Sequence, residues 1–213
     1  MRLVESFTSL QGESTHAGRI CHFLRLAGCN LSCNYCDTRY AQSFDAGEAA
    51  TVDDLINLAQ NSGVKLVEIT GGEPLASKET PELCRRLINA GFEVLLETNG
   101  SLSIAEIPRE VCKIVDCKLP DSGMAEANDV SNYDLLTSHD EIKFVVSSRA
   151  DFDWALEEIK RYNLESKCPN LLFSPVWGRV KFADLAEWVV KSRAPIRMQL
   201  QMHKQIWGDR PGV

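Results

Sequence analysis

The sequence predicts an α/β fold, a single domain built as a partial, abbreviated (β/α) barrel, and two observations carry that prediction. Apolar, β-branched segments typical of buried strands alternate with segments of helical periodicity, and about six or seven such units favour parallel strands joined by right-handed crossovers. The chain has 213 residues, 44% of them hydrophobic, which is enough for one ample core and short for two domains.

Each strand is predicted from a run of apolar residues. We expect strands over residues 20–26, 65–70, 92–97, 113–117, 141–146, 171–174 and 196–202. Apolar residues at helical spacing predict one helix over residues 152–162 and another over residues 182–190. In a sheet of this kind, chemistry gathers at the carboxyl ends of the strands.

Signals for helix ends predict two further helices. Thr51 followed by Asp54 is a capping-box pattern that begins the first of them, and Gly63 ends it. Thr80 and the proline after it suit the N-cap and first position of the second helix, which Gly91 ends. Both helices fall between predicted strands, as the alternating pattern requires.

Composition and charge exclude several classes of protein. The net charge of −7 argues against a broad nucleic-acid-binding surface, which requires clustered lysine and arginine. Residues 1–6 contain no long apolar run, so we expect no signal peptide, and no stretch approaches the roughly 20 apolar residues of a membrane span. Only three of the eight cysteines cluster, unlike the pairs of a secreted disulfide framework. We therefore expect a cytoplasmic protein whose other cysteines are buried thiols.

Three thiols form the most informative pattern in the chain: Cys29, Cys33 and Cys36, with three and then two residues between them. A closed zinc site and a complete iron–sulfur cubane both require four protein ligands. Three thiolates can hold three irons of a [4Fe–4S] cluster and leave the fourth iron open to chelate a small molecule. The spacing alone leaves two alternatives open, a Cys3His zinc site completed by His16 or His22, and buried thiols that only pack.

A second motif, Gly-Gly-Glu-Pro at residues 71–74, follows the predicted strand at 65–70. Its glycines let the backbone approach a ligand closely, although alone it reads as a tight turn. The cysteine spacing followed by this motif resembles the radical S-adenosylmethionine (SAM) superfamily. That resemblance implies a barrel of the radical SAM type, a [4Fe–4S] cluster on the three cysteines, and SAM on the open iron. Electron transfer from the cluster would then cleave SAM to a 5′-deoxyadenosyl radical that removes hydrogen from the substrate.

Polar segments end three other predicted strands. Residues 97–100 read Glu-Thr-Asn-Gly, residues 116–118 read Asp-Cys-Lys, and residues 174–177 read Ser-Pro-Val-Trp. Each has a plain structural interpretation, as a capped turn, a solvated triplet and core packing respectively. At the carboxyl edge of the sheet they are also placed to meet SAM, the last through Trp177 over the adenine.

The chain resembles one radical SAM family over nearly its whole length. The Gln-Gly-Glu segment at 11–13, the strand around Arg25, and the Asp-Thr pair at 37–38 together resemble the 7-carboxy-7-deazaguanine synthases of queuosine and 7-deazapurine biosynthesis. The resemblance implies a lyase that contracts the ring of 6-carboxy-5,6,7,8-tetrahydropterin, releases ammonia and forms 7-carboxy-7-deazaguanine. It also implies SAM as a regenerated cofactor and Mg²⁺ as an assisting metal.

The resemblance alone assigns roles to residues. The cluster, which is the catalytic centre, takes Cys29, Cys33 and Cys36. SAM would meet Tyr35, Cys36, Asp37, Gly72, Glu73, Asp116, Cys117, Lys118, Ser174, Pro175, Val176 and Trp177. The pterin would meet Leu10, Gln11, Gly12, Glu13, Arg25, Thr70, His203 and the terminal carboxylate of Val213. Thr38 would place its hydroxyl on Mg²⁺, a metal that prefers oxygen ligands.

The resemblance also divides the single domain, residues 1–213. It implies an N-terminal substrate-binding extension at 1–19 and a cluster and magnesium loop at 29–38. Arg25 stands mid-strand between leucines, which favours bidentate pairing with the substrate carboxylate over a surface ion pair. One position departs from the family pattern: Ser14 stands where glycine is usual, at a modest cost if the backbone there has positive φ.

The resemblance also predicts which partners this protein has. The resemblance implies a small pterin as substrate, a flavodoxin-like electron donor and a homodimer, with neither nucleic acid nor membrane as partner.

A glycyl-radical-enzyme activase would share the cysteine spacing and the glycine motif, yet would not need Gln11, Arg25 or Thr38. A non-catalytic metal-binding module, with zinc or iron, would leave the glycine motif unexplained.

Overall fold

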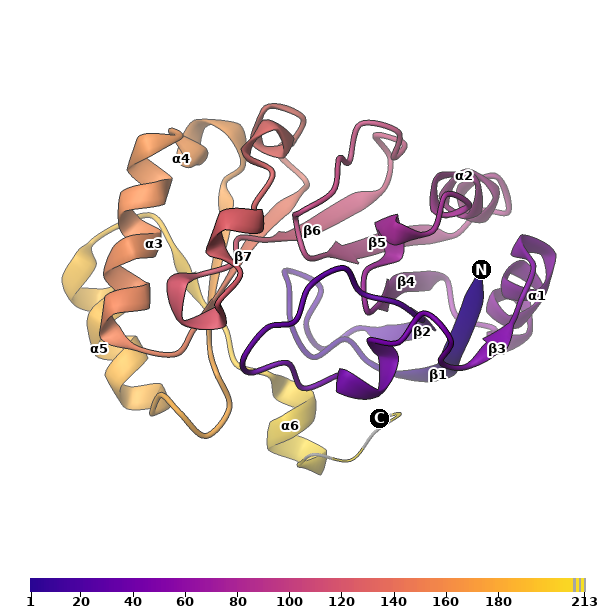
Figure 1. Cartoon of the computed structure of the whole chain (residues 1–213), viewed down its shortest axis with the longest axis horizontal. Coiled ribbons are helices and arrows are strands. Elements are labelled where there is room, and N and C mark those ends of the chain that lie inside the picture. Colours follow the sequence, from indigo (N-terminus) through magenta and orange to yellow (C-terminus); the bar gives the residue numbers. More distant parts are fainter. Residues whose placement is uncertain (209, 211, 213) are drawn as a thin grey trace.

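The computed structural model describes residues 1–208, 210 and 212, and within them one sheet of nine strands runs through the molecule (Figure 1). The strands are β1 (Arg2–Leu10), β2 (Ile20–Leu26), β3 (Glu48–Ala49), β4 (Leu66–Gly71), β5 (Glu93–Thr98), β6 (Cys112–Asp116), β7 (Glu141–Val146), β8 (Asn170–Pro175) and β9 (Arg197–Met198). Their order across the sheet is β3-β1-β2-β4-β5-β6-β7-β8-β9. Neighbours from β2 to β9 are parallel, whereas β1 pairs antiparallel with β2 and with β3. The predicted fold, a partial (β/α) barrel in one domain, is confirmed.

The α-helices are α1 (Val52–Ser62), α2 (Thr80–Asn89), α3 (Arg149–Arg161), α4 (Leu164–Lys167), α5 (Phe182–Ser192) and α6 (Met202–Trp207). In Figure 1, α1 and α2 lie together at one end of the molecule, α3, α4 and α5 lie at the other, and α6 stands apart from both groups. Between β6 and β7 the chain makes 3-10 turns at Pro120–Ser122, Ala125–Ala127 and Val130–Asp134. Among the described residues, no helix has the length and apolar character that crossing a membrane requires.

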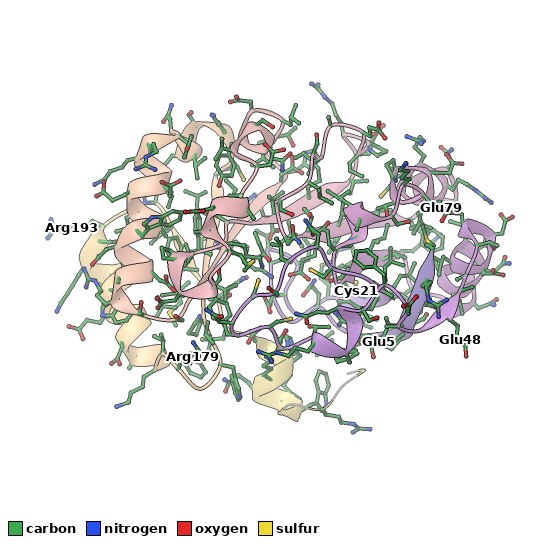
Figure 2. All side chains as sticks on the ribbon, viewed as in Figure 1. Glu5, Cys21, Glu48, Glu79, Arg179 and Arg193 are labelled. Atoms are coloured by element: carbon green, nitrogen blue, oxygen red, sulfur yellow. The ribbon has the colours of Figure 1, made fainter. Side chains whose placement is uncertain are left out.

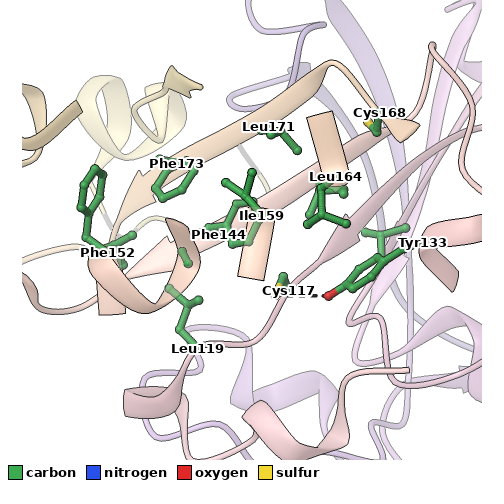
Figure 3. Close-up of a cluster of buried hydrophobic side chains, with 14 of the residues drawn as sticks. Cys117, Leu119, Tyr133, Phe144, Phe152, Ile159, Leu164, Cys168, Leu171 and Phe173 are labelled. Atoms are coloured by element: carbon green, nitrogen blue, oxygen red, sulfur yellow. Dashed lines mark hydrogen bonds between the residues drawn. The ribbon is translucent and has the colours of Figure 1, made fainter. Parts of the chain in front are cut away.

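Two apolar cores join the helices to one face of the sheet. One lies between α1, α2 and strands β2, β4 and β5, and the other between α3, α4, α5 and strands β6 to β8. In the second core Phe144 stacks on Phe173 with ring centroids 4.8 Å apart, and Tyr133 donates to Cys117 Sγ (Figure 3). Burying one such phenylalanine stabilises the fold by about 1.5–3 kcal/mol. Because side chains alternate along β7, Phe144 faces the helices and Lys143 faces the inside of the barrel.

The helix ends follow the predicted signals with one exception. Thr51 closes the predicted capping box of α1, and Gly63 ends that helix at φ 69°. Helix α2 begins at Thr80, but its N-cap is Glu79 rather than the predicted Thr80. The Thr80 hydroxyl donates instead to the Pro74 carbonyl over 2.5 Å, so it fixes the preceding turn rather than the helix amides.

Most strands lie within one residue of their predicted bounds, but one predicted strand is wrong and one strand was missed. The strands at 20–26 and 141–146 match, and four others differ by one residue at each end. The predicted strand at 196–202 is wrong over most of its length, because only Arg197–Met198 pairs with β8 and Met202 begins α6. Strand β1 was not predicted, because glutamate, serine and threonine interrupt its apolar residues.

Candidate functional site

A cavity of about 570 Å³ lies where the carboxyl ends of the parallel strands meet the loop after β2. Its walls include Leu10, Gln11, Gly12, Glu13, Arg25, Cys29, Cys33, Tyr35, Cys36, Asp37, Thr38, Thr70, Gly72, Asp116, Lys118, Val176, Trp177 and His203, all singled out from the sequence. The walls do not include Glu73, Cys117, Ser174 or Pro175, and Val213 lies outside the described residues. The cysteine loop, the strand ends and the β1–β2 loop therefore share one cavity.

The cluster loop, residues 29–38, carries three free, partly exposed thiols in the cavity wall. The side-chain nitrogen of Asn99, Nδ2, lies 3.7 Å from Cys29 Sγ and donates to it. Burial raises the pKa of Cys33 above its usual value, and the nearby Lys118 ammonium opposes part of this rise. Three free thiols on one short loop, open to a cavity and flanked by a cation, fit the three protein ligands of a [4Fe–4S] cluster with an open iron.

Neither histidine considered for a Cys3His zinc site reaches this cavity wall. The two ring nitrogens of His22 each lie 3.0 Å from a hydroxyl, Ser6 Oγ and Thr8 Oγ1. His16 lies at the other end of the barrel, near Glu93. The zinc alternative therefore lacks the fourth ligand that the sequence offered for it.

The Gly-Gly-Glu-Pro motif supports the base of the cluster loop by close backbone contact. A Cβ at Gly72 would lie 2.3 Å from the Gly28 carbonyl oxygen. One at Gly71, where φ is 145°, would lie 2.1 Å from the Leu26 carbonyl oxygen. The Glu73 amide donates to the same Gly28 carbonyl over 2.7 Å. Only glycine lets β4 come this close, so the motif positions the loop that holds the cysteines.

Glu73 lies behind this contact and is only 1% exposed. Its Oε1 accepts from Thr98 Oγ1 over 2.8 Å and from the backbone N–H of Leu75 over 2.9 Å. Its Oε2 accepts from the backbone N–H of Asn99 over 2.6 Å. Burial raises the pKa of Glu73 to about 7, although these donors oppose the shift. The carboxylate thus joins the ends of β4 and β5 and holds Asn99 beside the cluster loop. Its contact with SAM stays a prediction.

Lys143, which the sequence did not single out, lies in the cavity wall among three carboxylates. Its ammonium lies 3.3 Å from Glu13 Oε2 and 3.4 Å from Asp116 Oδ1, and donates to Glu97. Lys118 Nζ donates to Asp116 over 2.5 Å. Burial alone would lower the pKa of Lys143, but the carboxylates raise it well above its usual value. The lysine stays charged, and it holds together carboxylates that would otherwise repel one another.

The loop between β1 and β2 turns into the barrel and brings its first residues to the cavity. Gln11 Nε2 donates to the buried Glu68, and Gln11 Oε1 accepts from the Glu13 amide over 2.8 Å. Burial, followed by repulsion from another carboxylate, raises the pKa of Glu68. Ser14 has φ 64°, so the residue that replaces the usual glycine does adopt the left-handed region.

Arg25 and Thr70 lie opposite each other on β2 and β4 and face the cavity. Arg25 Nε donates to Glu5 Oε1 over 2.5 Å, and Figure 2 labels that glutamate. The Nη atoms of Arg25 make no hydrogen bond within the part of the chain that the structure describes. Thr70 Oγ1 donates to Glu97 Oε2 over 3.0 Å. The two Nη atoms of the guanidinium can therefore donate to a carboxylate in bidentate geometry.

Helix α6 lies against both the β1–β2 loop and the cluster loop. The His203 ring packs on Gly12, where a Cβ would lie 2.2 Å from Nδ1, and burial lowers the pKa of His203. Lys204 Nζ donates to Asp37 Oδ2 over 2.6 Å, and Thr38 Oγ1 donates to Asp37 Oδ1 over 2.9 Å. Burial opposes these interactions, but they lower the pKa of Asp37 to about 2. Two oxygen-bearing side chains on one loop suit a hard cation such as Mg²⁺.

The remaining residues predicted to meet SAM divide into two groups. Tyr35 lies in the wall, where its hydroxyl donates to the Val145 carbonyl over 3.0 Å and the Arg179 guanidinium lies 5.6 Å from its ring centre. Cys117 instead faces the core under the helices. Ser174 is fully buried, and its Oγ has no hydrogen-bond partner among the described residues.

Comparisons with known proteins agree with this geometry. A family model described as the radical SAM superfamily matches residues 24–189. Proteins named 7-carboxy-7-deazaguanine synthase from Koribacter versatilis and Chlorobaculum tepidum are 41% and 42% identical to this chain, over 97% and 100% of it and 97% of each relative. The crystal structure of QueE from Escherichia coli has the same fold, with a TM-score of 0.76 at 24% identity over 95% of this chain and 94% of that one. The chain therefore belongs to the radical SAM superfamily and, within it, to the family of 7-carboxy-7-deazaguanine synthases.

Proposed function

We propose that this chain is a radical SAM lyase that converts 6-carboxy-5,6,7,8-tetrahydropterin to 7-carboxy-7-deazaguanine. The observation that supports it best is one cavity that contains three free thiols together with buried carboxylates, an amide and an arginine. When bound, the [4Fe–4S] cluster and SAM supply a 5′-deoxyadenosyl radical that removes hydrogen at C6 of the pterin. The overall conversion releases one ammonia and needs no net oxidant, so SAM serves as a regenerated cofactor.

The cluster ligands in this proposal are Cys29, Cys33 and Cys36. Asn99 donates to the first of these sulfurs, and the Lys118 ammonium favours the thiolate form of the second. Such contacts to cluster sulfur would stabilise the reduced, more negative state of the cluster. Both side chains are therefore placed to favour reduction of the cluster by its electron donor.

SAM is assigned to the wall beside the cluster loop. Gly72 offers backbone without a side chain, and Asp116 and Lys118 present charge at the end of β6. Tyr35 and Trp177 provide aromatic surface in the same wall. The segments 116–118 and 174–177 thus contribute through the members that face the cavity.

Mg²⁺ is assigned to Thr38. Its hydroxyl donates to Asp37, which leaves the lone pairs of Oγ1 available to a metal. Magnesium keeps several positions for water and substrate oxygen, so one protein ligand in an open cavity is sufficient. The ion would neutralise part of the substrate carboxylate charge.

The pterin is assigned to the β1–β2 loop and the strands behind it. Glu13 accepts from the guanidine-like nitrogens, and Gln11 fixes that loop through Glu68. Arg25 takes the substrate carboxylate with its free Nη atoms. Lys143 holds Glu13 in place and keeps a positive charge under the ring. Leu10, Gly12, Thr70 and His203 complete the contact surface, and the terminal carboxylate of Val213 would close over it.

The wider setting follows from the family. A flavodoxin-like protein would supply the electron, the enzyme would act as a homodimer, and it would work in the cytoplasm. Residues 1–19 would serve as the substrate-binding extension and residues 29–38 as the cluster and magnesium loop.

An anaerobic assay tests the proposed function. Full-length protein, reconstituted with iron and sulfide, is incubated with reductant, SAM, Mg²⁺ and the pterin, and the deazaguanine product is measured by mass spectrometry. Cys33→Ser should abolish both SAM cleavage and product, whereas Cys84→Ser, in the α1–α2 core, should retain both. A sample that cleaves SAM and leaves the pterin unchanged would favour a glycyl-radical-enzyme activase. Zinc that the reconstituted protein holds in place of iron and sulfide, and that Cys33→Ser loses, would favour a metal-binding module.

A further inference from the structure

A second group of metal-ligating side chains lies at the opposite end of the barrel from the cluster loop. Cys112 and Glu141 are the first residues of β6 and β7, and His16 reaches them from the β1–β2 loop. One ligand atom from each of the three residues lies within 4.8 Å of the other two. None of them lines the cavity described above, and the proposed reaction does not use them.

Glu141 is fully buried and only half satisfied. Its Oε1 accepts two hydrogen bonds from Thr15, from the amide over 2.9 Å and from the hydroxyl over 2.5 Å. Its Oε2 is buried and has no hydrogen-bond partner within the described residues. A buried carboxylate oxygen without a donor is costly, so this atom requires either a proton or a cation.

Cys112 adds a thiol to the same place. It is 7% exposed, and its Sγ lies 3.0 Å from the His139 carbonyl oxygen, to which the thiol donates. Burial and the neighbouring Glu141 carboxylate raise the pKa of Cys112. A divalent ion would reverse this effect, because it would balance the charges of one thiolate and one carboxylate, and the thiol proton would leave to solvent.

His16 completes the group and has a carboxylate behind it. Its side chain is 17% exposed, and Nδ1 lies 3.7 Å from Glu93 Oε1 and 2.6 Å from Arg19 Nη1. Arg19 also donates to both oxygens of Glu93. A guanidinium only donates, so in this arrangement Arg19 donates to Nδ1 and the ring proton is on Nε2. When zinc binds Nε2, that proton moves to Nδ1, where it can face Glu93 once the Arg19 side chain, which is 46% exposed, turns away.

We propose that His16, Cys112 and Glu141 form a zinc-binding site at the base of the barrel. Thiolate, imidazole and carboxylate together suit Zn²⁺, and a solvent molecule would complete four-coordinate geometry. The ion would join the β1–β2 loop to the first residues of β6 and β7. Since the same loop carries Gln11 and Glu13 into the cavity, the zinc site would fix the substrate-binding segment from below.

Metal analysis of the loaded enzyme tests this site without reference to activity. Full-length protein with its iron–sulfur cluster in place, so that the cluster cysteines are occupied, is dialysed anaerobically against Zn²⁺ and then against metal-free buffer. We expect about one zinc per chain in addition to iron. His16→Ala and Glu141→Gln should weaken zinc binding by at least about tenfold, whereas His139→Gln, whose side chain is half exposed nearby, should bind as the parent does.

Two further measurements decide the outcome. Added zinc should raise the melting temperature of the parent protein and of His139→Gln but not of His16→Ala, and all three should melt alike in chelator if they fold alike. Anomalous diffraction at the zinc edge should place the metal between the three ligands. Absence of zinc at saturation, or zinc retained by both His16→Ala and Glu141→Gln, would overturn the proposal.

Discussion

Lys204 Nζ donates to Asp37 Oδ2 over 2.6 Å and so joins α6 to the cluster loop. The same helix begins beside Gly12, where the Met202 amide donates to the Gly12 carbonyl over 2.8 Å. In the residue before the helix, Gln201 Nε2 donates to Glu13 Oε1 over 2.7 Å. The C-terminal helix therefore bridges the loop proposed to bind the pterin and the loop proposed to bind the cluster.

Lys204→Met should loosen this bridge. The Asp37 side chain is 53% exposed, so solvent screening limits the lost ion pair to about 0.5–1 kcal/mol. We expect faster amide hydrogen exchange in residues 202–207 and weaker pterin binding, with the cluster content unchanged. Lys191→Met removes a more exposed ion pair, with Glu187 on the outside of α5, and serves as the control for the loss of one lysine. Unaltered exchange in α6 would show that the Gly12 and Glu13 contacts hold the helix without the lysine.

Thr38→Ala should raise the Mg²⁺ concentration needed for turnover. The variant removes the only oxygen that residue 38 offers beyond its backbone, whereas the thiols of the cluster loop stay intact. Activity titrated with Mg²⁺ should shift to higher concentration and recover at saturation. Ser32→Ala removes an exposed hydroxyl from the same loop and should leave the titration unchanged. Identical Mg²⁺ curves for parent and Thr38→Ala would remove this residue from the magnesium site.

Arg25→Ala should weaken pterin binding by about 1.5–3 kcal/mol, the usual loss for a hydrogen bond to a charged group. Among the described residues its Nη atoms make no hydrogen bond, whereas Nε is paired with Glu5. Anaerobic calorimetry with SAM present measures the change directly, and Arg85→Ala on the surface of α2 gives a matched loss of one arginine. Equal affinities for parent and Arg25→Ala would show that the pterin carboxylate points elsewhere.

Local signals predicted the fold well, and longer-range contacts explain the failures. The capping box at Thr51 and the stop at Gly63 are written in a few adjacent residues, so the bounds of α1 could be read directly. Residues 196–202 alternate in polarity like a strand, yet most of them do not pair. Contacts with Gly12 and Asp37 hold α6 in place, and these come from distant parts of the chain.

The same contrast holds for the candidate site. The cysteines and the glycine motif are compact in sequence, and both were found. Lys143 and Glu68 were missed, although each is a charged residue inside a buried strand. Among charged residues in the middle of predicted strands, only Arg25 was predicted to face the site. Charges at alternate positions of buried strands, such as Lys143 two residues after Glu141, mark the side that faces the barrel interior.

Lys118→Met should slow assembly of the cluster and move its pH dependence to higher pH. Thiolates bind iron, and burial already raises the pKa of Cys29 and Cys33. Lys118 lowers both, so removing its charge should leave less thiolate at neutral pH. The rate of anaerobic reconstitution, followed by absorbance across pH, tests this. Lys167→Met, on the surface beside Asp134, should reconstitute as the parent does, and a shared profile for all three proteins would contradict the prediction.

The pKa of Glu73 predicts how stability changes with pH. Burial raises it from 4.5 to about 7, so between these values the folded protein holds a proton that the unfolded chain has released. The free energy of unfolding should therefore fall as pH rises through this window, by about 3 kcal/mol at most, and change no further above it through this group. Because the side chain is 1% exposed, solvent screening does not reduce this figure.

Urea unfolding of the cluster-free protein at pH values from about 5 to about 8 measures the slope. Glu73→Gln cannot ionise and should lose this part of the pH dependence, even though it also loses bonds to Thr98 and Asn99 and is less stable throughout. Glu126→Gln removes an exposed carboxylate and should keep the parent's slope. If Glu73→Gln kept that slope as well, the three donors would be holding Glu73 ionised in the folded protein, with its pKa near that of the unfolded chain.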